Sequence, residues 1–248
     1  MKTFKTIMTK FIPPVIVNVA KREFHKETHI NRALQAVNGR TYVEIGVRSG
    51  TCFGHITAGN KIGIDPAPMN PAHKLAKNEQ FFQMTSDDFF ATEADKLFSH
   101  FPIDVALVDG LHEFCQALRD VLNLERFMSK NGIIFMHDCN PRFKEHAELR
   151  DGIWNGDVWK VPYYLKTYRT DLCVYTLDCD FGLGIISGFG RLSRIPTPDS
   201  EMIRACKSLG YQILDKQRRK VLGLRPFWFS RILLRRQTKA LHKSQSSS

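Results

Sequence analysis

Acidic and imidazole side chains gather where two apolar runs of the sequence end. One run is followed by Asp109 and His112, and the next by His137 and Asp138. These side chains transfer protons or bind metal ions, and clusters of them point to functional sites. Either histidine taken singly is most simply a core residue with its hydrogen bonds satisfied. The four together favour a functional site.

An earlier apolar run leads into a turn of the form acid-x-Gly-x-x-x-Gly, with Glu44 as the acid and Gly46 and Gly50 as the glycines. Glycine lets the backbone turn tightly near a ligand, and the acid can accept a hydrogen bond from an ammonium group. Arg48 stands where the dinucleotide motif G-x-G-x-x-G requires glycine, which disfavours NAD. An ordinary strand-to-helix turn remains the alternative.

Two further runs end in polar residues. Asp65 follows the second run, about 20 residues beyond the glycine turn, where a carboxylate can bind both hydroxyls of a ribose. An Asp before Pro66 is also common in turns. Ser86 and Asp87 follow the third run; either can cap the next helix and contact an adenine amino group.

The elements that position these residues form an alternating pattern. Strands are expected at residues 41–45, 61–64, 80–84, 103–108, 132–136, 172–177 and 182–187. The first five are each followed by at least 15 residues, enough for a helical crossover, whereas residues 178–181 allow only a hairpin. We therefore predict an α/β fold with a doubly wound, mostly parallel, seven-stranded Rossmann-like sheet and a terminal antiparallel hairpin.

Several segments within residues 40–190 resemble class I methyltransferases that use S-adenosylmethionine (SAM). The segments are VEIGVRSG, GIDP, TSDDFF, VDGLHEF followed by LRD, NGIIFMHDC and GDVWK. They are typical of the VDGxH/HD group, which is similar to the O-methyltransferases of sugars, including metal-dependent macrolide sugar enzymes.

The resemblance implies a role for each matching residue. Those expected to bind SAM are Glu44, Gly46, Ser49, Asp65, Ser86 and Asp87. Asp109 and Asp138 match carboxylates that bind a metal ion, and His112 matches the catalytic base. A third metal-binding carboxylate of the metal-dependent relatives has no counterpart that the sequence identifies.

Methyl transfer is an in-line displacement that needs a positioned acceptor oxygen and a base for its proton. The ordinary pKa of His112 leaves it mostly neutral at pH 7, and a place in the first turn of the next helix would disfavour its cation further. Mg²⁺ or Mn²⁺ on Asp109 and Asp138 would lower the pKa of an acceptor hydroxyl. The aromatic segment 151–168 is expected to cover the acceptor pocket or to pack as an ordinary amphipathic helix.

Three hypotheses follow from these residues. The chain is an O-methyltransferase of a sugar, glycoside or other small molecule that uses a metal ion, an O-methyltransferase that uses His112 alone, or a non-catalytic SAM-fold binding module. A degenerate module should have lost the acids at the strand ends, and here they are all present. An enzyme is therefore favoured.

The chain carries a net charge of +11, and its composition, 43% hydrophobic and 25% charged, excludes a mainly disordered or collagen-like protein. Residues 207–248 hold 11 Lys and Arg against one acid, Asp215, so this segment accounts for nearly all of the excess. We interpret it first as a solvated tail, next as a segment that contacts an anionic membrane, and last as a nucleic-acid binder. Removal of residues 217–248 should then leave the body folded.

The expected organisation is an N-terminal helical or irregular extension (1–39), a methyltransferase domain (40–190) and a basic C-terminal extension with a disordered end (191–248). The six cysteines show no CxxC spacing, and no segment of about 20 apolar residues is present. These features predict a cytoplasmic protein; peripheral membrane contact through the basic tail is the second interpretation of that segment.

Overall fold

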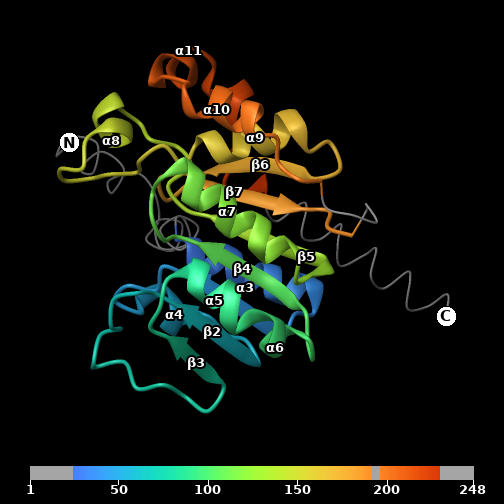
Figure 1. The fold of residues 1–248 in the computed structure, drawn as a ribbon. Helices are drawn as coiled ribbons and strands as arrows, with labels where there is room; N and C mark the ends of the chain where they lie inside the picture. Colours follow the sequence, from blue (N-terminus) through green and yellow to red (C-terminus); the bar gives the residue numbers. More distant parts are fainter. Residues whose placement is uncertain (1–24, 191–195, 230–248) are drawn as a thin grey trace.

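The computed structural model describes residues 25–190 and 196–229. Its centre is an eight-stranded sheet with the order β3-β2-β1-β4-β5-β7-β6-β8 (Figure 1). The strands are β1 (Thr41–Ile45), β2 (Asn60–Ile64), β3 (Glu79–Phe82), β4 (Ile103–Val108), β5 (Met128–Met136), β6 (Cys173–Asp178), β7 (Leu183–Ser187) and β8 (Arg225–Pro226). The helices are α3 (Lys26–Val37), α4 (Thr51–His55), α5 (Ser86–Thr92), α6 (Ala94–Phe98), α7 (Phe114–Glu125), α8 (Lys144–Glu148), α9 (Lys160–Tyr168), α10 (Ser200–Lys207) and α11 (Tyr211–Leu222).

Strands β1 to β5 are parallel, and β7 runs antiparallel to both β5 and β6. The predicted fold class, with its terminal hairpin, is confirmed. β1 and β4 have the predicted bounds, whereas β5 begins at Met128, four residues earlier than expected. The eighth strand was not predicted: Arg225 and Pro226 pair in parallel with the end of β6. Proline is tolerated there because β8 is the outer strand of the sheet.

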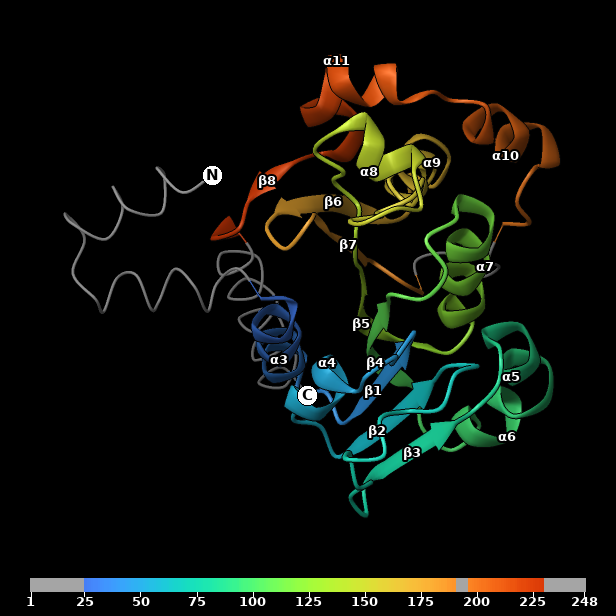
Figure 2. The ribbon, with the colours of Figure 1, turned by 90° about the vertical axis from the view of Figure 1, so that its left-hand side faces the viewer.

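Helices cover both faces of the sheet, as Figure 2 shows, with α3 and α4 on one side and α5, α6 and α7 on the other. Side chains of β1 alternate between two cores: Tyr42 packs on the first side, and Val43 and Ile45 pack on the second. Because both faces of the parallel strands are buried, these strands have continuous apolar sequences.

The described part of the basic segment is folded, so the interpretation as a solvated tail is wrong there. Helix α11 buries Leu214 and Leu222 in a cluster with Trp159, next to α9. The guanidinium of Arg218 donates hydrogen bonds to Asn140 Oδ1 and to the carbonyl of Pro141, both at 2.6 Å. Lys216, Arg219 and Lys220 of α11 are exposed, whereas Arg218 is half-buried.

Some expectations fall on residues outside the described ranges, namely 1–24 of the N-terminal extension and 230–248, which include the Ser-rich end. Residues 26–37 of that extension form α3. Within the described ranges, no helix combines the length and the apolar character that a membrane span requires.

Candidate active site

The turn between β1 and α4 depends on glycine. Gly46 has a φ of +89°, and a Cβ atom there would lie 2.2 Å from the carbonyl oxygen of Asp109. The amide of Gly46 donates to the carbonyl of Ile64, and the amide of Asp109 donates to the carbonyl of Ile45, both at 2.8 Å. The turn therefore lies directly against the end of β4.

Asp65, at the end of β2, braces the same turn. Its Oδ2 accepts a hydrogen bond from the amide of Arg48 at 2.7 Å, and its Oδ1 accepts one from the amide of Ala67 at 2.8 Å. The residue is only 9% exposed. Each carboxylate oxygen has two lone pairs, so both can still accept a hydrogen bond from a ribose hydroxyl.

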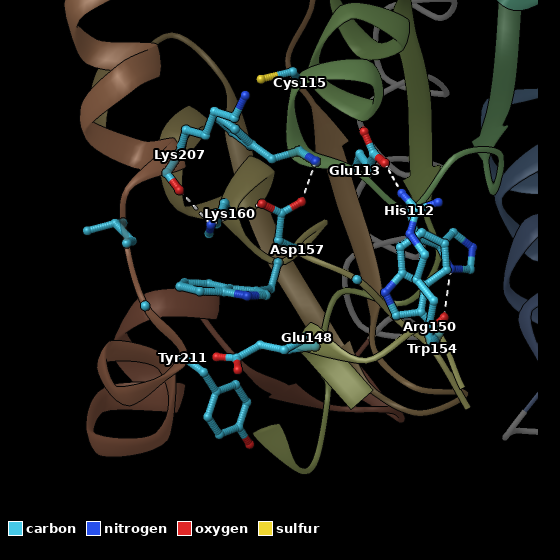
Figure 3. A pocket seen from close by; sticks show the side chains of 16 residues that line it. His112, Glu113, Cys115, Glu148, Arg150, Trp154, Asp157, Lys160, Lys207 and Tyr211 are labelled. Carbon is cyan, nitrogen blue, oxygen red and sulfur yellow. Dashed lines mark hydrogen bonds and ion pairs between the residues drawn. The ribbon is translucent and has the colours of Figure 1, made fainter. Parts of the chain in front are cut away.

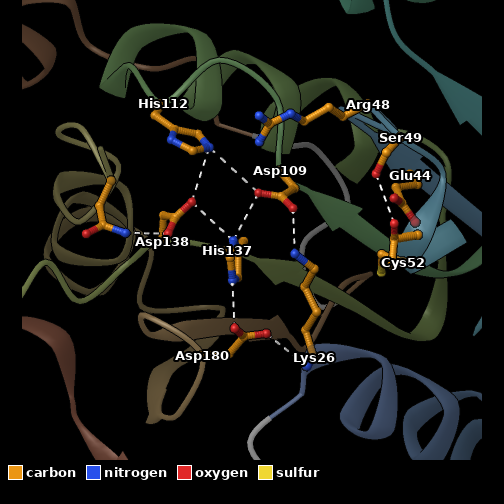
Figure 4. Close-up of polar contacts among 12 residues, drawn as sticks. Lys26, Glu44, Arg48, Ser49, Cys52, Asp109, His112, His137, Asp138 and Asp180 are labelled. Carbon is orange, nitrogen blue, oxygen red and sulfur yellow. Dashed lines mark hydrogen bonds and ion pairs between the residues drawn. The ribbon is translucent and has the colours of Figure 1, made fainter. Parts of the chain in front are cut away.

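Glu44 and Ser49 differ sharply in exposure. Glu44 is buried and accepts a hydrogen bond from the hydroxyl of Tyr42 at 2.6 Å. Burial raises the pKa of Glu44 to about 8, so this carboxyl is mostly protonated at neutral pH. Ser49 is exposed, and its hydroxyl bonds to that of Thr51 at 2.9 Å. Ser49 is thus open to a ligand, whereas Glu44 lies on the inner side of the turn (Figure 4).

The start of α5 holds Ser86 and Asp87, but neither caps the helix. Thr85 is the N-cap, and its hydroxyl accepts a hydrogen bond from the amide of Asp88, so the expected cap is wrong by one residue. The hydroxyl of Ser86 donates to Asp120 Oδ1 at 2.6 Å, and Asp87 pairs with Arg119 on the surface. Burial raises the pKa of Asp120 to about 6.

The ends of β4 and β5 bring the four predicted side chains into one Asp-His cluster of Asp109, His112, His137 and Asp138 (Figure 4). His137 Nδ1 lies 3.1 Å from both Asp109 Oδ1 and Asp138 Oδ2. His112 Nε2 lies 3.2 Å from Asp138 Oδ2 and 3.7 Å from Asp109 Oδ1. The juxtaposition that the sequence predicted for these strand ends is present.

The protonation expected for His112 is wrong in direction. Helix α7 begins at Phe114, so His112 lies before its first turn. Burial lowers the pKa of His112, but the neighbouring carboxylates of Asp109 and Asp138 outweigh burial, so the pKa is raised. His112 Nδ1 lies 2.8 Å from the carbonyl oxygen of Trp154, to which it must donate. Nε2 is therefore the nitrogen that faces the carboxylates.

Three residues of the site were not assigned a role from the sequence. Lys26 Nζ lies 2.8 Å from Asp109 Oδ2, and Asp180 Oδ1 lies 3.5 Å from His137 Nε2. The side-chain amide of Asn155 donates to Asp138 Oδ1. Asn155 belongs to the segment expected to cover the acceptor pocket, but only the fold brings Lys26 and the hairpin residue Asp180 to the cluster.

A pocket of about 400 Å³ borders His112 (Figure 3). It is lined by His112, Glu113, Phe114, Cys115, Ala147, Glu148, Arg150, Trp154, Gly156, Asp157, Trp159, Lys160, Lys207, Leu209, Gly210 and Tyr211. The Trp154 ring lies 5.4 Å from the His112 ring, and the Arg150 guanidinium lies 4.6 Å from the Trp154 ring. Residues 154–160 therefore help to form the pocket, whereas Tyr164 of α9 packs in the core. One part of the aromatic segment therefore lines a pocket beside His112, and α9 packs as a helix on the sheet; that the pocket receives an acceptor stays a prediction.

Asp109, His137 and Asp138 each offer one ligand atom, and these atoms lie within 4.8 Å of one another. Carboxylate and imidazole ligands fit a divalent cation such as Mn²⁺, and carboxylates also fit Mg²⁺. His137 is the third member of this group, whereas the sequence had indicated only Asp109 and Asp138 as metal ligands.

Comparison with known proteins finds a likeness to methyltransferase domains in this region. Residues 43–139 match the model of a family described as a methyltransferase domain. No curated protein matches the chain. The matched segment runs from β1 through the end of β5, and so includes Asp65, Asp109, His112 and Asp138.

Solved structures similar to the chain include the following three. An SAH-bound methyltransferase of Podospora anserina, PaMTH1, is 16% identical (TM-score 0.49), with 71% of this chain and 88% of that chain covered. Cofactor-bound Rv0187 from MTB is 12% identical (TM-score 0.49), with 75% and 95% covered. The mycinamycin-pathway methyltransferase MycE, in complex with Mg, SAH and mycinamycin VI, is 15% identical (TM-score 0.43), with 68% and 51% covered.

Proposed function

We propose that the chain is a SAM-dependent methyltransferase that methylates a hydroxyl of a sugar, glycoside or other small molecule. One observation carries the proposal: the glycine turn, Asp65 and the Asp-His cluster meet at the carboxyl edge of the sheet, and a pocket borders His112. Ligands of open α/β sheets bind at this edge. The methyltransferase-domain match over residues 43–139 supports the same reaction class.

SAM would bind along the ends of β1, β2 and β3. The backbone of the Gly46 turn can approach the methionine part of SAM, and the carboxylate of Asp65 can accept hydrogen bonds from the ribose hydroxyls. The hydroxyl of Ser86 already donates to Asp120, so towards an adenine amino group it can act only as an acceptor. This placement directs the sulfonium towards the end of β4, where the Asp-His cluster begins.

His112 would act as the base. Its Nδ1 is committed to the carbonyl of Trp154, so Nε2 of the neutral imidazole would accept the proton of the acceptor hydroxyl. The raised pKa of His112 shifts this neutral form to higher pH, so the rate should rise with pH. In the displacement, the oxygen forms a bond to the methyl carbon, the carbon–sulfur bond breaks, and its electron pair stays on the sulfur. Asp138, 3.2 Å from Nε2, would stabilise the imidazolium that forms.

Asp109 and Asp138 would hold Mg²⁺ or Mn²⁺, with His137 as a third ligand. When bound, such an ion lowers the pKa of a coordinated hydroxyl. Asn155 holds Asp138 through its other oxygen, so the carboxylate keeps its orientation.

The pocket favours a sugar-like acceptor. Its wall combines the rings of Trp154 and Tyr211 with charged groups such as Arg150 and Asp157. Aromatic faces with a few polar groups are typical of sites that bind ring-shaped polar ligands. A volume of about 400 Å³ is at the lower end of ligand pockets, which suits one or two rings.

The proposal is tested by methyl transfer from radiolabelled SAM to a panel of sugar nucleotides, glycosides and catechols, with and without EDTA. His112→Ala should lower the rate about 10²- to 10⁴-fold, the usual contribution of a general base. His100→Ala is the control, because His100 is exposed and lies at the opposite end of β4. An unchanged rate for His112→Ala would refute the role of the base, and SAM binding without transfer to any acceptor would favour the binding module.

A further inference from the structure

Lys26 connects the N-terminal segment to the Asp-His cluster. It is the first residue of α3, far in sequence from the strand ends that form the site. Its Nζ lies 2.8 Å from Asp109 Oδ2, and its backbone amide donates to Asp180 Oδ2 at 3.1 Å (Figure 4). One residue is thus bonded to two carboxylates, one after β4 and one in the turn between β6 and β7.

The packing of α3 holds Lys26 in this place. Ile30, Ala33 and Leu34 are buried on the face of the sheet that also buries Val105 and Leu107 of β4. The C-terminus of α3 is closed by Asn38 in the left-handed conformation, with its amide bonded to the carbonyls of the last turn. The helix therefore has its own apolar anchorage, and the Lys26–Asp109 ion pair is not needed to attach it.

The ion pair divides the two oxygens of Asp109 between different partners. Oδ2 accepts from Lys26, while Oδ1 lies 3.1 Å from His137 Nδ1 and 3.7 Å from His112 Nε2. The side chains of Lys26 and Asp109 are only 15% and 16% exposed, so water competes weakly for this contact. Rotation of Asp109 would break the charge-assisted bond to Lys26, which is stronger than a neutral hydrogen bond.

We infer that Lys26 is a positioning residue of the catalytic site: its ammonium fixes Asp109 so that Oδ1 faces the two histidines. The inference rests on the proposed methyltransferase function and deepens it. Lys26, the first residue of α3, then belongs to the active site. Lys26 acts through Asp109 and needs no contact with SAM.

Two variants with a control test this role in the full chain. Lys26→Met removes the charge and keeps the length, Lys26→Arg keeps the charge, and Lys96→Met is the control, an exposed lysine of α6. For Lys26→Met, kcat should fall about 10- to 100-fold, the cost of a misplaced catalytic group, while the Kd for SAM stays within about twofold. Lys26→Arg should recover most of kcat, and Lys96→Met should match the parent.

A kcat for Lys26→Met within about twofold of the parent would overturn the inference, and so would an equal loss in Lys26→Arg. If Lys26→Met does not fold, Lys26→Gln, which keeps a donor without the charge, replaces it under the same expectations. Crystal structures test the positioning without turnover: Asp109 should turn away from the histidines in Lys26→Met and keep its orientation in Lys26→Arg. An unchanged Asp109 in Lys26→Met would also overturn the inference, whereas a parent chain that does not bind SAM would refute only the proposed function.

Discussion

Asp65→Ala should weaken SAM binding and also lower the free energy of unfolding, because Asp65 has two separate roles. Its carboxylate accepts two backbone hydrogen bonds, from Arg48 at 2.7 Å and from Ala67 at 2.8 Å. Hydrogen bonds to a charged group contribute about 1.5–3 kcal/mol each, and water can replace part of this, so the free energy of unfolding should fall by about 2–4 kcal/mol. Loss of the ribose contacts should weaken SAM binding by about 1–3 kcal/mol, roughly 5- to 150-fold in Kd.

Asp104→Ala provides a matched control at the opposite edge of the sheet. Asp104 Oδ2 likewise accepts two backbone hydrogen bonds, from Arg40 at 2.8 Å and from Thr41 at 3.1 Å. Urea denaturation should show similar losses of stability for both variants, whereas isothermal titration should show weaker SAM binding for Asp65→Ala alone. Equal Kd values for folded Asp65→Ala and the parent would refute the assignment of Asp65 to the ribose.

Three further predictions concern the Asp-His cluster, Asp120 of α7 and Leu214 of α11. If a metal ion takes part, Asp138→Asn should lower metal-dependent turnover at least about 10²-fold while SAM still binds, and full activity after dialysis against EDTA would exclude the metal scheme. Burial raises the pKa of Asp120 to about 6 in the folded chain, above roughly 3.9 in the unfolded chain. Between these two pH values the folded state binds more protons than the unfolded state. The stability of the fold therefore falls as the pH rises through this range. Asp120→Asn should therefore gain about 1–3 kcal/mol in unfolding free energy relative to the parent between pH 4 and pH 7, and a difference that is constant with pH would contradict this. Leu214→Ala should cost about 2–5 kcal/mol in urea denaturation because Leu214 is fully buried, whereas exposed Lys216→Ala should change little; a small effect of Leu214→Ala would restore the interpretation as a solvated tail.

Most of the sheet could be predicted from the sequence because its central strands are buried on both faces. β1 and β4 have the predicted bounds, since each apolar run is flanked by residues typical of turns. The Asp-His cluster followed from the same reasoning, because carboxyl ends of parallel strands meet at one edge. Local pattern and topology together were enough to bring Asp109, His112 and Asp138 to one place, whereas the roles proposed for them came from the family resemblance.

The remaining features depend on contacts between distant parts of the chain. Leu214 and Leu222 are buried because α11 packs near α9. The sequence did not indicate this packing, because basic residues such as Arg218 and Lys220 in the same segment favoured a solvated tail. The raised pKa of His112 depends on Asp138, which belongs to another strand end. Lys26 reaches Asp109 across 83 residues of sequence, a contact that no local pattern indicates.

SAM and the acceptor are expected on either side of the Asp-His cluster, and a crystal structure of the full chain with SAH and an acceptor would test this placement most directly. The ribose should lie on the carboxylate of Asp65, the sulfur should face the end of β4, and the acceptor hydroxyl should lie within hydrogen-bond distance of His112 Nε2. SAH bound away from the ends of β1 and β2, or an acceptor outside the pocket beside His112, would contradict the account.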